Sequence, residues 1–331
     1  MTTTSVCGMR RLSEAQVRLR PVVVIVGPTA VGKSRIALEI AKAFETDILT
    51  ADSRQVYRGM DIGTDKPPAD QLKEVTHRLI DLVEPDQPFN TGLYRRYAVQ
   101  AIEDLYHGRR LPLVVGGSGL YIRTLLKGLC EAPPADPILR ASLRRDAQKH
   151  GRDYLYAQLV ACDPVTAARL HPRDQSKVLR ALEVHRLSGR PMVEFQQKHG
   201  FTEGPFTSLV IGLNRGREAL YRRIEQRIDW QFANGLVDET KRLLARGYSR
   251  DLSALKGLGY RHVSSYLVGE YDAEEMVARF KRDTRRFAKR QMTWFRKESG
   301  IHWMMIEESE PVALTTDRIL QQIDAFLASL G

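Results

Sequence analysis

The most constraining feature of this sequence is a glycine-rich turn that follows an apolar run and precedes a helical pattern. Residues 22–26, VVVIV, form a β-branched run typical of a fully buried parallel strand. Residues 27–34, GPTAVGKS, match the pattern GxxxxGK[ST], and apolar residues recur at helical spacing from Ile36 onward. A strand, this loop and a helix in that order predict an α/β fold with a P-loop NTPase-like core, in which helices flank a parallel sheet.

The residue types of the loop suit a bound di- or triphosphate. Glycines let the loop curl so that backbone N–H groups point at phosphate oxygens, and the helix N-terminus adds the positive end of its dipole. Lys33 supplies a full charge, and the hydroxyl of Ser34 can bind Mg²⁺. The motif is typical of nucleotide-binding and ATP-binding proteins, and the alternative is a plain turn without a ligand. The predicted phosphate contacts are Gly27, Pro28, Thr29, Ala30, Val31, Gly32, Lys33 and Ser34.

Strand and helix signals alternate along the rest of the chain and predict βαβ units. Helices are expected from Asn90 or Thr91 to about His107, after residues 116–119 as far as Lys127, and at about 217–233, 236–246, 272–297 and 311–329. Strands are expected at DILTA (47–51), HRLIDLV (77–83), LPLVV (111–115) and TSLVIGL (207–213), with an edge strand at IHWMMI (301–306).

The pattern changes between about residues 130 and 200, where no strand is visible. Asp136, Asp163 and Asp174 are each expected to cap a helix, the first two being followed by proline at the first helical position. The predicted organisation is a basic mobile tail over 1–20, a P-loop α/β core over 21–129 and 205–331, and an all-helical insertion domain over 130–204.

The charge of the chain points to a polyanionic partner. Lys and Arg number 51 against 40 Asp and Glu, for a net charge of +11, although a GC-rich genome also favours arginine codons. Residues 279–297 hold nine bases and one acid, and Met276, Phe280, Phe287 and Trp294 mark one apolar face of the predicted helix. A solvated basic face is the alternative to contact with a nucleic acid.

Other classes of protein find no support in the composition. No apolar run is long enough to span a membrane, and no secretory signal is visible. The three cysteines lie far apart and form no disulfide framework, which indicates a reducing compartment, the cytoplasm. The eight histidines show no metal-binding spacing.

Two further turns lie at the ends of predicted strands, where ligands bind in doubly wound sheets. Asp52 directly follows the second strand and is a candidate general base, with a loop-capping role as the alternative. Ser118, in the turn Gly116–Leu120, can donate or accept a hydrogen bond or belong to a plain strand-to-helix turn. The strand LPLVV ends in Gly-Gly rather than in an Asp that could hold Mg²⁺, HRLIDLV carries Asp81 in mid-strand, and no Asn-Lys-x-Asp tetrapeptide occurs. A P-loop transferase therefore fits better than an ATPase motor or a GTPase.

Seven motifs in order resemble those of the bacterial tRNA dimethylallyltransferases, the isopentenyl-diphosphate:tRNA transferase family, from about Val22 to Trp303. They are GPTAVGKS, ADSRQVYRGMDIGTDKP, HRLIDLVEP, PLVVGGSGLY, HPRDQSKVLRALEV, RRIEQRID and KGLGYRH. The resemblance implies transfer of a dimethylallyl group from dimethylallyl diphosphate to the exocyclic amine of the adenosine 3′ of the anticodon. It implies Mg²⁺ as cofactor, the tRNA anticodon stem-loop as partner, and a monomer without a membrane partner.

The resemblance also implies roles for individual residues. Asp52 would be the base, and Lys33, Ser118 and Arg227 would be the other catalytic residues. Thr29 to Ser34 would hold the donor diphosphate rather than ATP, clamped by Arg223 or Arg227, with the motif alignment favouring Arg227. The implied tRNA contacts are Asp52, Ser53, Arg54, Gln55, Ser118, Arg140, Ser176, Lys177, Val178, Leu179, Arg180, Lys256, Gly257, Leu258, Gly259, Tyr260 and Arg261.

The sequence departs from the family pattern at one position and carries a weaker assignment at another. Ser118 stands where many family members have threonine, which keeps the hydroxyl, and Arg54 occupies a motif position that varies.

Three rival functions also stay open. The first rival is a P-loop kinase for a small metabolite, and the second is a prenyltransferase for free adenylate. The third is an RNA-binding protein without catalysis, against which the intact Lys33, Ser34 and Asp52 argue.

Overall fold

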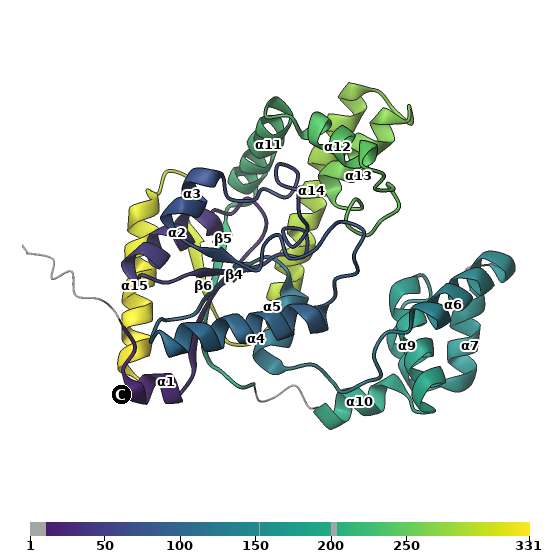
Figure 1. Ribbon diagram of the computed structural model, residues 1–331, viewed down its shortest axis with the longest axis horizontal. Helices are drawn as coiled ribbons and strands as arrows, with labels where there is room; N and C mark the ends of the chain where they lie inside the picture. Colours follow the sequence, from purple (N-terminus) through teal and green to yellow (C-terminus); the bar gives the residue numbers. More distant parts are fainter. Residues whose placement is uncertain (1–10, 152, 200–203) are drawn as a thin grey trace, which may run out of the picture. The chain divides into compact units, whose positions relative to one another are not determined.

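The computed structural model describes residues 11–151, 153–199 and 204–331, which form two compact units (Figure 1). One unit comprises Met1–Leu126 and Pro205–Gly331, and the other comprises Lys127–Gly204. The expected limits of the insertion, 130 and 204, lie close to this division. In the part of the chain that the structure describes, no helix is long and apolar enough to cross a membrane.

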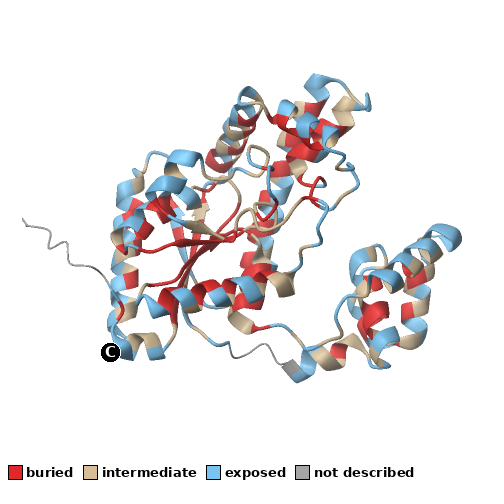
Figure 2. Ribbon diagram, in the orientation of Figure 1, coloured by how far each residue is buried: buried red, intermediate tan, exposed pale blue. Residues whose placement is uncertain are grey.

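The first unit is built on one parallel sheet, which has six strands within the described residues and the order β3-β2-β4-β1-β5-β6. The central strands β1, β2 and β4 are buried along their whole length (Figure 2), as the β-branched sequence of β1 predicts. The expected α/β class is therefore confirmed. The strands are β1 (Pro21–Val26), β2 (Ile48–Ala51), β3 (His77–Arg78), β4 (Leu113–Gly116), β5 (Thr207–Arg215) and β6 (Ile301–Ile306).

Only the first two residues of the expected strand 77–83 join the sheet. Leu79 and Asp81 have φ angles of 68° and 52°, in the left-handed region that an extended strand excludes. The chain turns away there, and Val83 forms an isolated bridge with Tyr57 instead. The prediction of a full third strand was wrong because an apolar run without strict periodicity does not separate a strand from an irregular buried segment.

The helices expected for the first unit are present, and α1, α3 and α13 are additional helices that the sequence pattern did not predict. Asn90 caps α4 as expected, with its side chain accepting a hydrogen bond from the N–H of Leu93, and Gly108 ends that helix. Figure 1 shows α2 on one side of the sheet and α4 on the other. The helices are α1 (Glu14–Arg18), α2 (Lys33–Ala43), α3 (Ala69–Glu74), α4 (Thr91–His107), α5 (Gly119–Lys127), α11 (Arg217–Ala233), α12 (Leu236–Ala245), α13 (Leu258–Leu267), α14 (Ala273–Phe295) and α15 (Val312–Ala328).

The predicted mobile tail is wrong for residues 11–20, and residues 1–10 lie outside the described residues. Leu12 is buried in the main core, and Ser13 and Gln16 form a capping box at the start of α1. The side-chain amide of Gln16 also donates to the carbonyl of Leu327 in α15. One buried leucine and a capped turn are too short a signal for a periodicity argument to detect.

The basic helix α14 buries a different face from the one expected. Met276 and Phe280 are buried, but Phe287 is 38% exposed, while the polar Gln291 is buried. Several successive buried residues of the helix, such as Phe280 and Thr284, are four positions apart. In a helix of 3.6 residues per turn, each interval of four moves the buried position about 40° around the helix axis. Over 23 residues the line of buried residues therefore rotates away from Phe287.

The second unit is all-helical, with no strand among the described residues 127–151 and 153–199. Asp136, Asp163 and Asp174 each accept a backbone N–H at a helix start, so the three predicted caps are confirmed. The unit has a hydrophobic core of its own, to which Leu143 and Leu159 contribute. Its helices are α6 (Pro137–His150), α7 (Tyr154–Cys162), α8 (Pro164–Arg169), α9 (Gln175–Ser188) and α10 (Met192–His199).

Candidate active site

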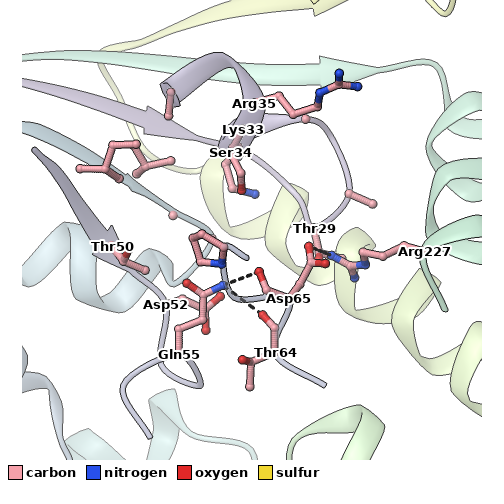
Figure 3. Close-up of a pocket in the computed structure, with 18 of the residues that line it drawn as sticks. Thr29, Lys33, Ser34, Arg35, Thr50, Asp52, Gln55, Thr64, Asp65 and Arg227 are labelled. Carbon is pink, nitrogen blue, oxygen red and sulfur yellow. Dashed lines mark hydrogen bonds and ion pairs between the residues drawn. The ribbon is translucent and has the colours of Figure 1, made fainter. Parts of the chain in front are cut away.

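A cavity of about 620 Å³ lies at the carboxyl ends of β1, β2 and β4 (Figure 3). The N-terminus of α2, the loop around Asp65 and the helix α11 form its other walls. This is where a doubly wound sheet places its ligands, because successive strands deliver their loops to one edge. Among its lining residues are Thr29, Gly32, Lys33, Ser34, Arg35, Asp52, Gln55, Asp65, Gly117, Arg223 and Arg227.

The phosphate-binding loop has the backbone that its glycines predict. Gly27 and Gly32 have φ angles of 151° and 114°, and a Cβ atom on Gly27 would lie 2.6 Å from the carbonyl oxygen of Leu213. Thr29, Ala30, Gly32, Lys33 and Ser34 line the cavity, whereas Gly27, Pro28 and Val31 do not. Five of the eight loop residues predicted from the motif therefore face the cavity, and the other three only support the loop.

The ammonium group of Lys33 rests on its own loop. It donates to the carbonyl oxygens of Gly27 at 3.0 Å and Pro28 at 2.8 Å. Burial lowers the pKa of Lys33 from 10.5 to about 8, with a smaller lowering from Arg227, while Asp52 and Asp65 act in the opposite direction. An incoming diphosphate would supply the negative charge that this buried cation lacks.

Three arginines stand behind or beside the loop. Arg215 Nε donates to the carbonyl oxygen of Val31, and Arg223 Nε donates to that of Ala30, both at 2.9 Å. Burial lowers the pKa of Arg223, with further lowering from its cationic neighbours. Arg227 instead pairs with Asp65 at 3.3 Å, and its Nε is buried without a partner. Both candidate clamps, Arg223 and Arg227, therefore line the cavity.

Asp52 lines the cavity, whereas Ser118, a predicted catalytic residue, does not and instead contacts the backbone next to Asp52. The backbone N–H of Arg54 donates to Asp52 Oδ1 at 2.8 Å, so this carboxylate caps its own loop while it lines the cavity. Ser118 Oγ accepts from the N–H of Ser53 at 3.0 Å, and the N–H of Ser118 donates to the carbonyl of Ala51 at 3.1 Å. The loops after β2 and β4 are thus tied to each other, and among the described residues the second oxygen of Asp52 has no hydrogen-bond partner.

Gln291 of α14 joins these loops to the phosphate-binding loop and was missed by sequence reasoning. Its Oε1 accepts from the N–H of Thr29 at 2.9 Å, and its Nε2 donates to the carbonyl of Gly117 at 3.0 Å. A Cβ atom on Gly117 would lie 2.3 Å from Gln291 Nε2, which accounts for glycine there. A glutamine among the bases of a surface helix gives no signal of this role.

The predicted tRNA contacts at residues 256–261 lie on the first unit, directly after a segment that contacts Arg54. The guanidinium of Arg54 donates to the carbonyl oxygen of Ser253, which brings the Asp52 loop next to this segment. Lys256 is exposed, whereas Tyr260 is fully buried and its hydroxyl donates to Glu239 at 2.7 Å. Of the others, Leu258 is half-buried, Gly257 and Gly259 are buried, and Arg261 pairs with Asp283 at 2.8 Å.

The predicted tRNA contacts in the insertion also include both exposed and buried residues. Ser176 and Lys177 are exposed, while Val178 and Leu179 belong to the hydrophobic core of the second unit. The side chains of Val178 and Leu179 are therefore not available to a ligand, which sequence position alone does not reveal.

Arg140 and Arg180 converge on one buried carboxylate, Glu183. Arg140 makes a two-pronged contact with it, with N–O distances of 2.8 and 2.9 Å, and Arg180 donates to it at 2.6 Å. Burial alone would raise the pKa of Glu183, but the hydrogen bonds from these arginines outweigh it and the pKa is lowered. Both arginines thus have a structural partner within their own unit.

The residues of the cavity also show which protein oxygens could bind the expected Mg²⁺. Among the described residues, no group of three or more His, Cys, Asp or Glu side chains could hold a metal ion. The Ser34 hydroxyl and the Asp52 carboxylate do line the cavity as oxygen donors. Mg²⁺ is commonly held by one or two protein oxygens together with substrate phosphates and water. The donor set therefore fits an ion that arrives with a diphosphate rather than one held by protein alone.

Comparisons with known proteins agree on one family. The sequence model of IPP transferase matches residues 55–298. The tRNA dimethylallyltransferase 2 of Geotalea daltonii is 47% identical over 292 residues, 88% of this chain and 89% of that protein. The tRNA dimethylallyltransferase of Geobacter sulfurreducens is 46% identical over 282 residues, 85% of this chain and 91% of that protein.

A solved structure gives the same result. The full-length tRNA isopentenylpyrophosphate transferase of Bacillus halodurans has a TM-score of 0.71 and 35% identity, covering 94% of this chain and 98% of that one. Nothing in these comparisons supports a small-molecule kinase or an adenylate prenyltransferase.

The pKa of Lys33 predicts how diphosphate binding depends on pH. Bound diphosphate favours the protonated lysine, so binding above about pH 8 requires proton uptake. We expect the affinity for an alkyl diphosphate, itself fully ionised there, to fall by up to about tenfold per pH unit. Titration calorimetry between pH 7 and 10 measures this. Lys33→Arg keeps its charge throughout and should show a flat profile, so an equal fall in that variant would contradict the assignment.

The position of Gln291 predicts a second outcome. Gln291→Leu keeps the approximate volume but leaves the Thr29 N–H and the Gly117 carbonyl without their partner. We expect a loss of about 1–3 kcal/mol in the free energy of unfolding for each group left unpaired, and weaker diphosphate binding. Chemical denaturation and calorimetry test both. Thr293→Ala, on an exposed position of the same helix, should change neither, and wild-type behaviour of Gln291→Leu would show that the loops do not depend on this side chain.

Proposed function

This chain belongs to the IPP transferase family, and from that premise we propose how its residues carry out tRNA dimethylallyl transfer. The reaction moves a dimethylallyl group from dimethylallyl diphosphate to the exocyclic amine of the adenosine 3′ of the anticodon and releases diphosphate. The observation that carries the proposal is the placement of a phosphate-binding loop and the Asp52 carboxylate on one cavity. One holds the leaving group, and the other faces the nucleophile.

The phosphate-binding loop holds the donor through its diphosphate. Lys33, together with Arg223 or Arg227, stabilises the charge that develops on the diphosphate as the carbon–oxygen bond breaks. Mg²⁺, held by Ser34 and the diphosphate, would supply further charge neutralisation when bound. Leaving-group stabilisation counts here because the allylic carbon takes on positive charge, and the cavity must keep water from that carbon.

Asp52 acts as the general base. The adenine amine is delocalised into the ring and is a poor nucleophile, so it gains from a carboxylate that accepts its proton as the carbon–nitrogen bond forms. Asp52 Oδ1 is engaged by the Arg54 N–H, which orients the carboxylate and leaves the other oxygen available. The adenine must leave its stack to reach this oxygen, as in other enzymes that modify a base.

The tRNA is held by basic residues on both units. Arg54 is half-buried and contacts Ser253, Lys256 is exposed a few residues further along that segment, and Lys177 is exposed on the insertion. Arg140 and Arg180 retain guanidinium N–H groups for phosphate contact while Glu183 fixes their orientation, and Val178 and Leu179 act only through packing. A monomer working in the cytoplasm completes the proposal.

The experiment that tests the function is mass spectrometry of nucleosides from unmodified tRNA incubated with the protein, Mg²⁺ and dimethylallyl diphosphate. We expect dimethylallyl adenosine at the position 3′ of the anticodon. Product with free AMP, or phosphate transfer from ATP, would favour the rival functions. A tRNA that carries guanosine at that position serves as the control.

Asp52→Asn gives the sharpest test of the mechanism. The amide keeps the shape and a hydrogen-bond acceptor but loses basicity, so we expect single-turnover transfer to slow by about 10²–10⁴-fold at saturating substrates. Affinity for tRNA, measured by filter binding, should stay near that of the wild type. Transfer at the wild-type rate would show that Asp52 is not the base. A normal rate at saturation with weaker tRNA binding would make it a positioning residue.

A further inference from the structure

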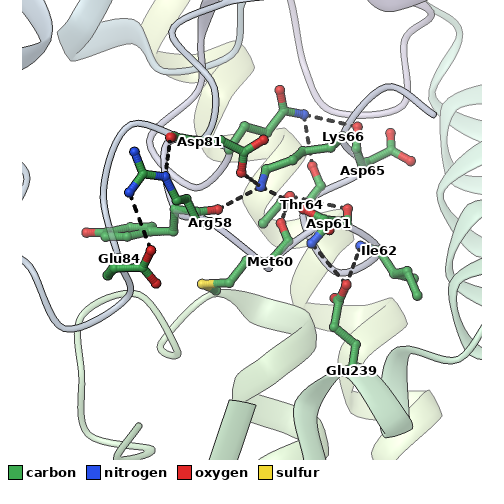
Figure 4. A network of polar contacts seen from close by, with 12 residues as sticks. Arg58, Met60, Asp61, Ile62, Thr64, Asp65, Lys66, Asp81, Glu84 and Glu239 are labelled. Carbon is green, nitrogen blue, oxygen red and sulfur yellow. Dashed lines mark hydrogen bonds and ion pairs between the residues drawn. The ribbon is translucent and has the colours of Figure 1, made fainter. Parts of the chain in front are cut away.

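Residues 60–66, MDIGTDK, form a segment that we call the strap; the sequence motif includes it, but no role has been assigned to it. The strap is fixed by a buried carboxylate, Glu239 of α12 (Figure 4). Glu239 accepts hydrogen bonds from the backbone N–H groups of Asp61, Ile62 and Gly63 at 3.0, 2.9 and 3.1 Å. Three charge-assisted hydrogen bonds to consecutive residues hold this backbone in one conformation.

Other contacts hold the middle and the C-terminal end of the strap. A Cβ atom on Gly63 would lie 2.5 Å from the ring of Tyr260, so only glycine permits this approach. Lys66, whose side chain is buried, donates to the carbonyl of Tyr57 and pairs with Asp61, both at 2.7 Å, and it also pairs with Asp81. The strap is therefore a rigid element rather than a free loop.

This rigid element points one carboxylate into the cavity. Asp65 has a φ angle of 59°, an uncommon conformation for a residue other than glycine. Gln55 Nε2 donates to the carbonyl oxygens of Thr64 and Asp65, both at 3.0 Å, and helps to hold it (Figure 3). Backbone strain that surrounding contacts maintain is a feature of functional sites.

The carboxylate of Asp65 pairs with Arg227, which is one of the two arginines proposed to clamp the donor diphosphate. Asp65 Oδ2 lies 3.3 Å from a terminal nitrogen of Arg227, and both side chains line the cavity beside Lys33. The Asp65 carboxylate is 43% exposed and the Arg227 side chain 21%, so the pair faces the open space of the cavity. A diphosphate seated on the loop would compete with Asp65 for the same guanidinium.

We propose that Asp65 is an internal counter-ion for Arg227, which the donor diphosphate displaces on binding and which pairs with Arg227 again when the product diphosphate leaves. The inference rests on the proposed function, because it assumes that a diphosphate occupies the loop. Asp65 then lowers the affinity of the cavity for diphosphates, and it aids product release because the departing anion leaves Arg227 paired. Neither role belongs to the proton transfer assigned to Asp52.

The test is equilibrium binding of inorganic pyrophosphate and of dimethylallyl diphosphate to Asp65→Asn, with and without Mg²⁺. Asparagine also tolerates a positive φ angle, so the strap should keep its fold. Partly exposed ion pairs contribute about 0.2–1 kcal/mol, so we expect affinity for both ligands to rise by about 1.4- to fivefold. Product inhibition by pyrophosphate should strengthen in the same proportion.

Two controls separate the counter-ion role from other effects. Asp61→Asn removes a carboxylate of the same strap that pairs with Lys66 and does not line the cavity, and it should leave diphosphate affinity unchanged. In an Arg227→Ala background, Asp65→Asn should no longer tighten binding, because the shared cation is gone. If Asp65→Asn lowers the melting temperature, Asp65→Gly removes the carboxylate and relieves the strain, and the same rise in affinity is expected.

Unchanged or weaker binding by both Asp65 variants would overturn the inference. Weaker binding confined to Mg²⁺-containing buffer would identify Asp65 as a metal ligand and would also overturn it. These outcomes leave the proposed function intact if transfer to tRNA is still observed. A wild-type protein that binds neither pyrophosphate nor dimethylallyl diphosphate would instead contradict the proposed function, and the inference with it.

Discussion

The carboxamide of Gln291 is the contact on which the geometry of the site depends. It is the one described side chain that hydrogen-bonds both to the phosphate-binding loop, at Thr29, and to the turn after β4, at Gly117. That turn carries Ser118, which holds the N–H of Ser53 next to Asp52. A single buried amide therefore helps to set the spacing between the phosphate-binding loop and Asp52, the proposed base, and proximity effects require that spacing to be accurate.

The glycines of the β4 turn follow from the same helix. A Cβ atom on Gly119 would lie 2.2 Å from Trp294 Nε1, as one on Gly117 would meet Gln291. A Cβ atom on Gly116 would lie 2.1 Å from the carbonyl of Ala51. These glycines allow α14 and β2 to approach the turn closely, so that one face of α14 supports the site while its basic residues remain on the surface.

The sequence predicted those parts of the site that depend on backbone type and strand order. A strand before GPTAVGKS and Asp52 after the next strand place both at one edge of a parallel sheet, and they line one cavity. Contacts between residues distant in sequence were not predictable. Examples are Gln291 with Thr29, which are 262 residues apart, and the pairing of Arg140 and Arg180 with Glu183. Hydrophobic periodicity also failed where a polar side chain is buried, as on α14.

The two carboxylates that line the cavity, those of Asp52 and Asp65, are held by different contacts, and this suits the different roles proposed for them. Asp52 is held through one oxygen by the N–H of Arg54, a neutral donor, so its second oxygen can accept a proton. Asp65 is held through its backbone, and its side chain faces the guanidinium of Arg227. In the proposed mechanism, proton acceptance and counter-ion exchange thus belong to carboxylates with different partners, although both side chains are aspartates that line one cavity.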